Sequence, residues 1–317
     1  MHPAFSVIAF TTLSGAGYGL LFWAAFAALA AAASARALLV ALALALVLCS
    51  VGLLASLLHL GKPLRAWRAF SQWRTSWLSR EGVLAMLTYV PAVLLGAALL
   101  PAMLDDRTPG AVPELNVAGV AVALLVIACA LATVYCTAMI YASLTPIPAW
   151  RHRLVPPVYV GFALLTGGLM LLALANPTEN IVGHIAAKAV MALALVLWLA
   201  KWRYWRDIAA PLPATRGAAV GLAERRVSVF ERPHTEANYI TREMAFVVAR
   251  RHALQLRFAS VVLFALVPTL CMLAALLLED AGAMPWFAIA AGSALAGTFV
   301  ERWLFFAEAR HMVTLYY

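Results

Sequence analysis

Long apolar segments alternate with short polar ones along almost the whole chain. An α-helix needs about 20 apolar residues to cross the ~30 Å hydrocarbon core of a bilayer. Segments of that length predict eight membrane-spanning helices, at 5–33, 37–60, 81–103, 116–142, 157–175, 183–200, 254–278 and 285–306. Proline and glycine between them, as in GKP and EDAGAMP, break the helices there. The pattern therefore predicts an all-α fold: a polytopic membrane protein whose residues 1–317 form one eight-transmembrane-helix bundle.

The composition supports a membrane protein. Of the 317 residues, 65% are hydrophobic and only 12% are charged, and the mean hydropathy is +0.90. A soluble domain of this length needs more charge on its exterior. The first apolar segment starts directly after MHP, lacks a basic region before it, and is too long for a cleavable signal. We therefore expect the helices themselves to direct insertion.

Basic residues collect on one side of the predicted bundle. Of the 23 Lys and Arg residues, only Arg36, Arg107 and Lys188 fall on the face opposite the two termini. Cytoplasmic loops of membrane proteins carry an excess of Lys and Arg. We therefore expect a multi-pass protein of the bacterial inner membrane, with both termini, the loop 61–80 and the segment 202–253 in the cytoplasm.

The segment 202–253 is the one long polar stretch. Its sequence RVSVFERPHTEANYITREMAFVVARRHALQLR, which runs on into the seventh span, mixes charges with apolar residues and predicts an amphipathic helix. Such a helix could lie along the membrane surface or dock a partner subunit. The acidic residues Glu236 and Glu243 favour docking, because a helix that only lies on the membrane needs fewer acidic residues.

One loop has a histidine and a carboxylate at its two rims. In LLASLLHLGKPLRAWRAFSQWRTSWLSREGVLAML, residues 53–87, His59 closes one apolar span and Glu81 opens the next. Helix dipoles alone explain this placement, because a helix C-terminus favours an imidazolium and an N-terminus favours a carboxylate. A quinone site explains it as well, because a quinone head needs hydrogen-bond partners and a proton route at the membrane edge. The residues by themselves leave both explanations open.

Four further residues are candidates for the same site. Arg65 lies in the loop, and the rings of Trp67 and Trp77 could roof a quinone pocket or belong to an ordinary interfacial aromatic belt. Arg302, near the end of the last span, could pair with Glu81 or line the entrance. Together with Glu301 it could instead anchor that helix at the interface.

Metal and haem sites are not expected in this chain. The cysteines Cys49, Cys129, Cys136 and Cys271 all lie within predicted spans and form no C-x-x-C pair, which excludes zinc and iron–sulfur ligation by them. A bis-histidine haem needs two histidines at the same depth. Only two of the seven histidines, His59 and His184, are near apolar spans, and they lie at opposite rims, roughly 25–30 Å apart.

The segment ASLLHLGKPLRAWRAFSQWRTSWLSRE resembles the signature of the DMSO reductase membrane-anchor family (the DmsC type), which is related to the polysulfide-reductase and NrfD-like quinone-reactive anchors. The likeness is densest at 51–82, and the eight-span pattern extends it over the whole chain. In that family the histidine of the H-L-G-x-P motif and the glutamate that opens the next helix are quinol-site residues, which implies these roles for His59 and Glu81. The resemblance also implies ubiquinone or menaquinone as redox partner.

The same resemblance implies two partner subunits, a molybdopterin catalytic subunit and a ferredoxin-like iron–sulfur subunit. The well-known respiratory DMSO reductases export their catalytic subunits, so their HLG loop faces the periplasm, whereas charge places this loop in the cytoplasm. The chain is in this respect similar to the sulfite-dehydrogenase branch, as are its opening MHPAFSVIAFTTLSGAGYGL and its close ERWLFFAEARHMVTLYY. We therefore expect electrons from cytoplasmic sulfite oxidation to reach quinone, with His59 donating a hydrogen bond to a carbonyl and Glu81 relaying protons.

Two alternatives stay open. A quinol-oxidising anchor of a DMSO or polysulfide reductase would use the same site in reverse. A secondary transporter is less consistent with the sequence, because transporters place interrupted helices and charges near the midplane, whereas the ionisable residues here gather at the rims. Lipid is the remaining expected partner, and no nucleic acid is expected.

Overall fold

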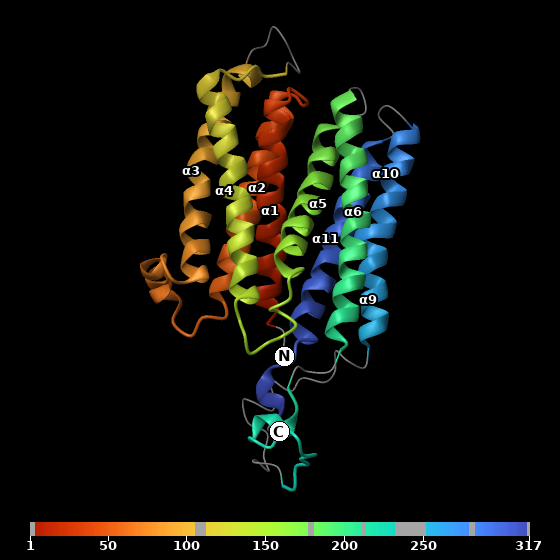
Figure 1. The fold of residues 1–317 in the computed structure, drawn as a ribbon. Coiled ribbons are helices and arrows are strands. Elements are labelled where there is room, and N and C mark those ends of the chain that lie inside the picture. Colours follow the sequence, from red (N-terminus) through yellow and green to blue (C-terminus); the bar gives the residue numbers. More distant parts are fainter. Residues whose placement is uncertain are drawn as a thin grey trace.

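Apolar segments of spanning length form helices along the whole chain. The computed structural model describes residues 4–104, 112–176, 181–210, 214–231, 252–278 and 283–315. Its long helices run side by side along one axis (Figure 1). They are α1 (Phe5–Leu29), α2 (Ala35–Leu57), α3 (Trp77–Leu104), α4 (Val117–Ala142), α5 (Val155–Ala175), α6 (Ile181–Ile208), α9 (Ala253–Val261), α10 (Val267–Leu278) and α11 (Met284–Ala307). The predicted all-α membrane bundle is confirmed, and the described residues contain no strand.

Seven helices of the described chain are long and apolar enough to span a membrane. They are α1 to α6 and the continuous helix Ala253–Leu278, in which the π-helical turn η4 (Val262–Leu266) joins α9 to α10. The eighth predicted span is α11, which has 24 residues but is less apolar because small and polar residues such as Gly297, Thr298 and Glu301 interrupt it. The predicted count of eight is therefore not exact.

Two helix ends differ from their predicted positions in ways that matter for the site. The helix α3 begins at Trp77 and not at 81, which places Glu81 one turn inside the helix. The helix α6 continues to Ile208 and not only to 200, because the sequence after Ala200 has no helix breaker and its rings Tyr204 and Trp205 are buried against the bundle.

The segment 202–253 divides between described and undescribed residues. Its start belongs to α6, and the short helix α7 (Arg216–Ala219) follows. The predicted amphipathic helix falls mainly on residues 232–251, outside the described part of the chain, so its expected role in docking stays a prediction.

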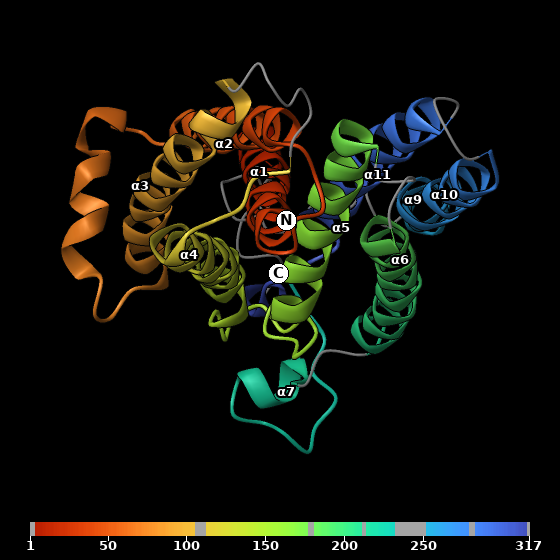
Figure 2. The same cartoon turned by 90° about the horizontal axis from the view of Figure 1, so that it is seen from above.

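The helix α1 lies in the middle of the bundle, against α2, α4, α5 and α11 (Figure 2). It approaches α5 closely at Gly19: a Cβ atom on this residue would lie 1.7 Å from the carbonyl oxygen of Ala163. On the α5 side, a Cβ on Gly167 would lie 2.1 Å from the carbonyl carbon of Gly19. Small residues permit such backbone contact between membrane helices, where packing replaces the hydrophobic effect as the driving force.

Substitution Gly19→Ala is expected to destabilise the bundle, because the added methyl group forces α1 and α5 apart. Overpacking of this kind costs about 1–3 kcal/mol, occasionally more. Unfolding of the purified protein in detergent measures the loss. The control is Gly292→Ala in α11, where a Cβ would meet no atom within 4 Å; equal stability of the two variants would contradict the proposed close packing.

Candidate functional site

The loop between α2 and α3 lies at the end of the bundle that holds both termini (Figure 1). The helix α2 ends at Leu57, the 3-10 helix η1 (Pro63–Gln72) follows, and α3 begins at Trp77. The glycine and proline of GKP stop α2, because Pro63 cannot continue an α-helix from α2 but suits the first position of η1. As a result η1 runs outside α3, as both views show (Figures 1 and 2).

Side chains from both sides attach η1 to α3. The hydroxyl of Ser79 donates to the carbonyl of Ala69, and the ring of Phe70 lies so close to Gly82 that a Cβ on that glycine would be 3.0 Å from it. At the far end of the loop, the guanidinium of Arg80 donates to the carbonyl of Trp73 at 3.0 Å. The loop is therefore held at a defined distance from the bundle.

A cavity of about 560 Å³ lies between this loop and the helices α1, α2, α3 and α4. This volume falls within the roughly 300–1,000 Å³ of small-molecule sites. Of the six predicted site residues, His59, Arg65 and Glu81 line it. The remaining lining is largely apolar, with Phe10 of α1, Leu53 of α2 and other aliphatic side chains. The structure thus brings together three residues that are up to 22 positions apart in the sequence.

Glu81 is the buried carboxylate of the cavity. Its residue is only 5% exposed, and its Oε1 accepts a hydrogen bond from the hydroxyl of Thr137 on α4 at 2.7 Å. Because Glu81 lies one turn inside α3 and bonds to a neighbouring helix, an N-terminal capping role does not explain its position. A carboxyl group that is removed from water and bonded to a neighbouring hydroxyl is suited to hold and release a proton.

His59 lines the same cavity from a position just after the end of α2. It is exposed, as are Lys62 and Arg65, which line the same cavity. The imidazole is therefore open to solvent where Glu81 is closed to it. The cavity therefore has exposed basic residues where the loop lines it, and a buried carboxyl group that is bonded to α4.

The predicted roofing tryptophans lie outside this lining. Trp67 is 64% exposed, with the guanidinium of Arg68 located 5.7 Å from its ring centroid. Trp77 packs edge-on against Tyr135 of α4, with centroids 6.1 Å apart, and the guanidinium of Arg80 lies 4.3 Å from its ring centroid. Both rings therefore sit on the rim, as an interfacial belt does.

Arg302 is far more deeply buried than expected and does not pair with Glu81. Its Nη1 lies 3.3 Å from Oε2 of the adjacent Glu301, and its guanidinium is stacked 3.5 Å from the ring centroid of Tyr159. Glu301 in turn lies 2.5 Å from Nζ of Lys201 on α6. The alternative that Glu301 and Arg302 anchor α11 at the interface is also wrong, because their exposed fractions are 0% and 2%.

Three residues of these sites were not recognised from the sequence. Thr137 and Tyr141 lie within the apolar span of α4, where polar atoms are the only signal; Tyr141 lines the cavity with Glu81. Lys201 is among the basic residues predicted on the side of the two termini, although it is 1% exposed. The helix-compatible sequence KWRYWRDI after the apolar run could have indicated that α6 continues.

The lining of the cavity fits a quinone head. A flat apolar ring with two carbonyls needs apolar walls and hydrogen-bonding groups, and the cavity offers an imidazole and a carboxyl group in a largely apolar lining. Among the described residues, no group of three or more His, Cys, Asp or Glu side chains is placed to hold a metal ion. The four cysteines are free and buried.

Comparison with known proteins gives two matches over the length of the chain. The family model of the DMSO reductase anchor subunit (DmsC) matches residues 1–307. A sulfite dehydrogenase subunit of Allochromatium vinosum is 33% identical over 332 residues, which cover 100% of this chain and 99% of that protein. Both matches include the loop, the cavity and the buried pair Glu301–Arg302.

Proposed function

Because this chain belongs to the DMSO reductase anchor subunit (DmsC) family, we propose that it binds quinone in the cavity between η1 and α1–α4 and exchanges electrons with it. The chain is the membrane anchor subunit of an oxidoreductase complex. We propose that its electrons come from an iron–sulfur subunit attached to a molybdopterin subunit. The single observation that supports the quinone site is the convergence of His59, Arg65 and Glu81 on one largely apolar cavity.

Each polar residue of the cavity has its own role in quinone binding or proton transfer. A bound quinone supplies the redox chemistry, since it takes up two electrons and two protons on full reduction. The exposed His59 donates a hydrogen bond to one carbonyl. Arg65, which lines the same cavity, stabilises negative charge on the ring oxygens. The buried Glu81 holds a proton that it can give up toward the ring, while Thr137 orients its carboxyl group.

The direction of electron flow is proposed from the relative. The protein that is 33% identical over the full length is named as a subunit of sulfite dehydrogenase. We propose that this chain likewise serves sulfite oxidation and passes electrons to quinone. A quinol-oxidising anchor of a DMSO or polysulfide reductase would need the same cavity, so activity distinguishes the two.

The test uses the complete complex, purified from its membranes. Sulfite is expected to drive reduction of decylubiquinone or menadione, and a photoreactive quinone analogue is expected to label peptides of α2, η1 and α3. Labelling confined to α6 and α10 would place quinone elsewhere and overturn the site. Quinol oxidation with dimethyl sulfoxide or polysulfide, without sulfite activity, would reverse the proposed direction.

The proposed orientation, with the loop and both termini in the cytoplasm, has its own test. The helix η1 and the start of α4 lie at opposite ends of the bundle (Figure 1). Ser71 in η1 and Glu114 before α4 are exposed, and the native cysteines are buried. A membrane-impermeant maleimide is expected to label Glu114→Cys in spheroplasts and Ser71→Cys only in inverted vesicles. The reverse labelling pattern would show that the protein has the opposite orientation in the membrane.

A further inference from the structure

A buried cluster of charges lies between α6 and α11, away from the quinone cavity. Lys201, Glu301 and Arg302 are 1%, 0% and 2% exposed, and the carboxylate of Glu301 lies between the two cations at 2.5 and 3.3 Å. Charges removed from water cost several kcal/mol each, so such groups inside a membrane protein are usually functional. The proposed quinone site uses none of the three.

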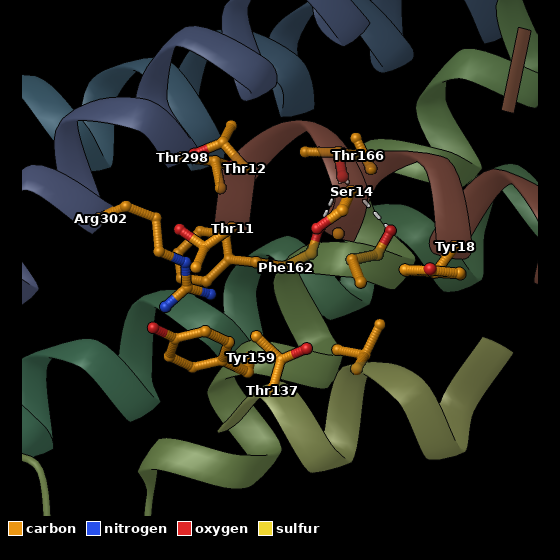
Figure 3. Close-up of a pocket in the computed structure, with 14 residues that line it drawn as sticks. Thr11, Thr12, Ser14, Tyr18, Thr137, Tyr159, Phe162, Thr166, Thr298 and Arg302 are labelled. Atoms are coloured by element: carbon orange, nitrogen blue, oxygen red, sulfur yellow. Dashed lines mark hydrogen bonds between the residues drawn. The ribbon is translucent and has the colours of Figure 1, made fainter. Parts of the chain in front are cut away.

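A small polar cavity adjoins this cluster. It has a volume of about 10 Å³ and is lined by Arg302, by Tyr18 and several hydroxyl side chains of α1, and by residues of α4, α5 and α11 (Figure 3). Roughly 10–15 Å³ is the space that one water molecule requires. Among the described residues, the hydroxyls of Thr12, Tyr18 and Tyr159 and the Nε of Arg302 have no hydrogen-bond partner. Four unpaired polar atoms around one water-sized space indicate ordered water.

This cavity reaches Glu81 through one side chain. Thr137 lines the cavity, points into it beside Tyr159 (Figure 3), and donates its hydroxyl proton to the carboxylate of Glu81 at 2.7 Å. Tyr159 and Arg302 also line a second cavity of about 10 Å³, which continues to Lys201 and Tyr204. The two spaces therefore meet at the stacked pair of Tyr159 and Arg302.

Tyr204, which lines the second cavity, contacts both Lys201 and His152. Nζ of Lys201 lies 4.0 Å from the ring centroid of Tyr204, and that ring also meets the ring of His152 edge-on, with centroids 5.4 Å apart. His152 Nε2 lies 3.3 Å from Oδ2 of Asp207, and the two side chains are 18% and 25% exposed. Burial lowers the pKa of His152, while the hydrogen bond and the charge of Asp207 act in the opposite direction.

We infer that ordered water in these two cavities, together with Thr137 and Tyr159, forms a proton path from the Lys201–Glu301–Arg302 cluster to Glu81. Each transfer is balanced: Thr137 passes its hydroxyl proton to the Glu81 carboxylate while taking another from the cavity water, and that water regains a proton from the cluster, which is reprotonated from solvent in turn. The inference rests on the proposed role of Glu81 at the quinone site.

The physical need for this path follows from the shape of the quinone cavity. Glu81 is 5% exposed, whereas His59 is exposed. A ring that fills the cavity would stand between this carboxyl group and the solvent at His59. Protons must then reach Glu81 from the interior of the bundle, where Thr137 of α4 is its hydrogen-bond partner.

The first test is direct observation of the water. A cryo-EM map of the complete complex, at a resolution that shows ordered water, is expected to contain density between Tyr18, Tyr159 and Arg302 and a second density near Lys201. Empty cavities on both sides of Arg302 would overturn the path.

The second test removes single hydroxyls with little change of shape. Thr137→Val and Tyr159→Phe are expected to slow reduction of decylubiquinone by about 100-fold, the low end of what positioned acid–base groups contribute. Dye-linked activity in the partner subunits should be unchanged. Thr137→Ser should restore the rate, and azide or formate, small weak acids that carry protons, should partly restore it in the valine variant. The control is Thr133→Val, one turn away on α4, whose hydroxyl bonds to a backbone carbonyl and Thr88.

The outcomes separate this inference from the proposed function. If Glu81→Gln abolishes quinone reduction while Thr137→Val and Tyr159→Phe keep normal rates, the path is wrong and the quinone site stands. If the two hydroxyl variants are slow but weak acids do not restore the rate, the side chains only shape the site and the path is also wrong. If Glu81→Gln keeps full quinone activity, the proposed function itself fails.

Discussion

Glu81→Gln is expected to abolish electron transfer to quinone while the partner subunits keep their activity with artificial dyes. Glutamine keeps the shape of the side chain and can still accept the hydrogen bond from Thr137, but it cannot carry a proton. Positioned proton donors contribute about 10²–10⁴ to a rate, so a loss in that range is expected. His59→Ala should lose a comparable factor, because it removes the proposed hydrogen-bond donor to the quinone.

The measurement is sulfite-dependent reduction of decylubiquinone by the purified complex, compared with reduction of a water-soluble dye by the same preparation. Glu114→Gln and His252→Ala are the matched controls, because both residues are exposed and lie outside the cavity. A full quinone rate in either site variant would remove that residue from the mechanism. An equal loss of dye activity would point to failed assembly of the complex, and size-exclusion chromatography with the partner subunits detects that failure.

Lys201→Met is expected to destabilise the folded protein by about 3–5 kcal/mol, the cost of leaving a buried charge without its partner. The carboxylate of Glu301 lies 2.5 Å from Lys201 Nζ and is fully buried, and it would keep only the longer contact of 3.3 Å with Arg302. The double variant Lys201→Met/Glu301→Gln should recover most of the stability. In that variant the uncompensated negative charge is gone and only Arg302 stays charged, stacked on Tyr159.

Unfolding by SDS titration in detergent micelles measures these free energies. The control is Arg203→Ala. Arg203 lies two residues after Lys201 on α6 and forms a partly exposed ion pair with Asp207. Exposed pairs are worth about 0–1 kcal/mol. If Lys201→Met is as stable as Arg203→Ala, Glu301 is protonated in the folded protein and the cluster holds one proton more than its charges suggest. Additive effects in the double variant would show that Lys201 and Glu301 are not coupled.

The loop 58–76 shows how far local sequence reaches. GKP ends α2 and begins η1, and the alternation of basic and aromatic residues predicts an interfacial loop, because these features depend only on the residues concerned. The meeting of His59 and Glu81 was expected because a short loop joins two adjacent helices. The sequence does not predict whether the tryptophans line the cavity, since an interfacial ring and a pocket ring have the same composition and differ only in orientation.

The burial of the three charged residues does not follow from the local sequence. Lys201, Glu301 and Arg302 follow apolar runs, where positive residues ordinarily mark the membrane surface. Whether such a residue faces solvent or a neighbouring helix depends on the length of its own helix and on the partner opposite, and Lys201 and Glu301 are 100 residues apart in the chain. The same holds for Thr137, whose partner Glu81 is 56 positions away.

The sequence by itself determined the membrane class, the all-helical fold, the approximate spans, the basic side of the bundle and the two residues at the rims of one loop. These properties follow from hydrophobicity, helix breakers and charge, which act over neighbouring residues. Only the tertiary structure decided that Glu81 is bonded to Thr137, that Arg302 belongs to a buried cluster with Lys201, and that water-sized cavities lie between them. Those facts depend on how helices rotate and approach one another, and side-chain packing between distant segments sets that geometry.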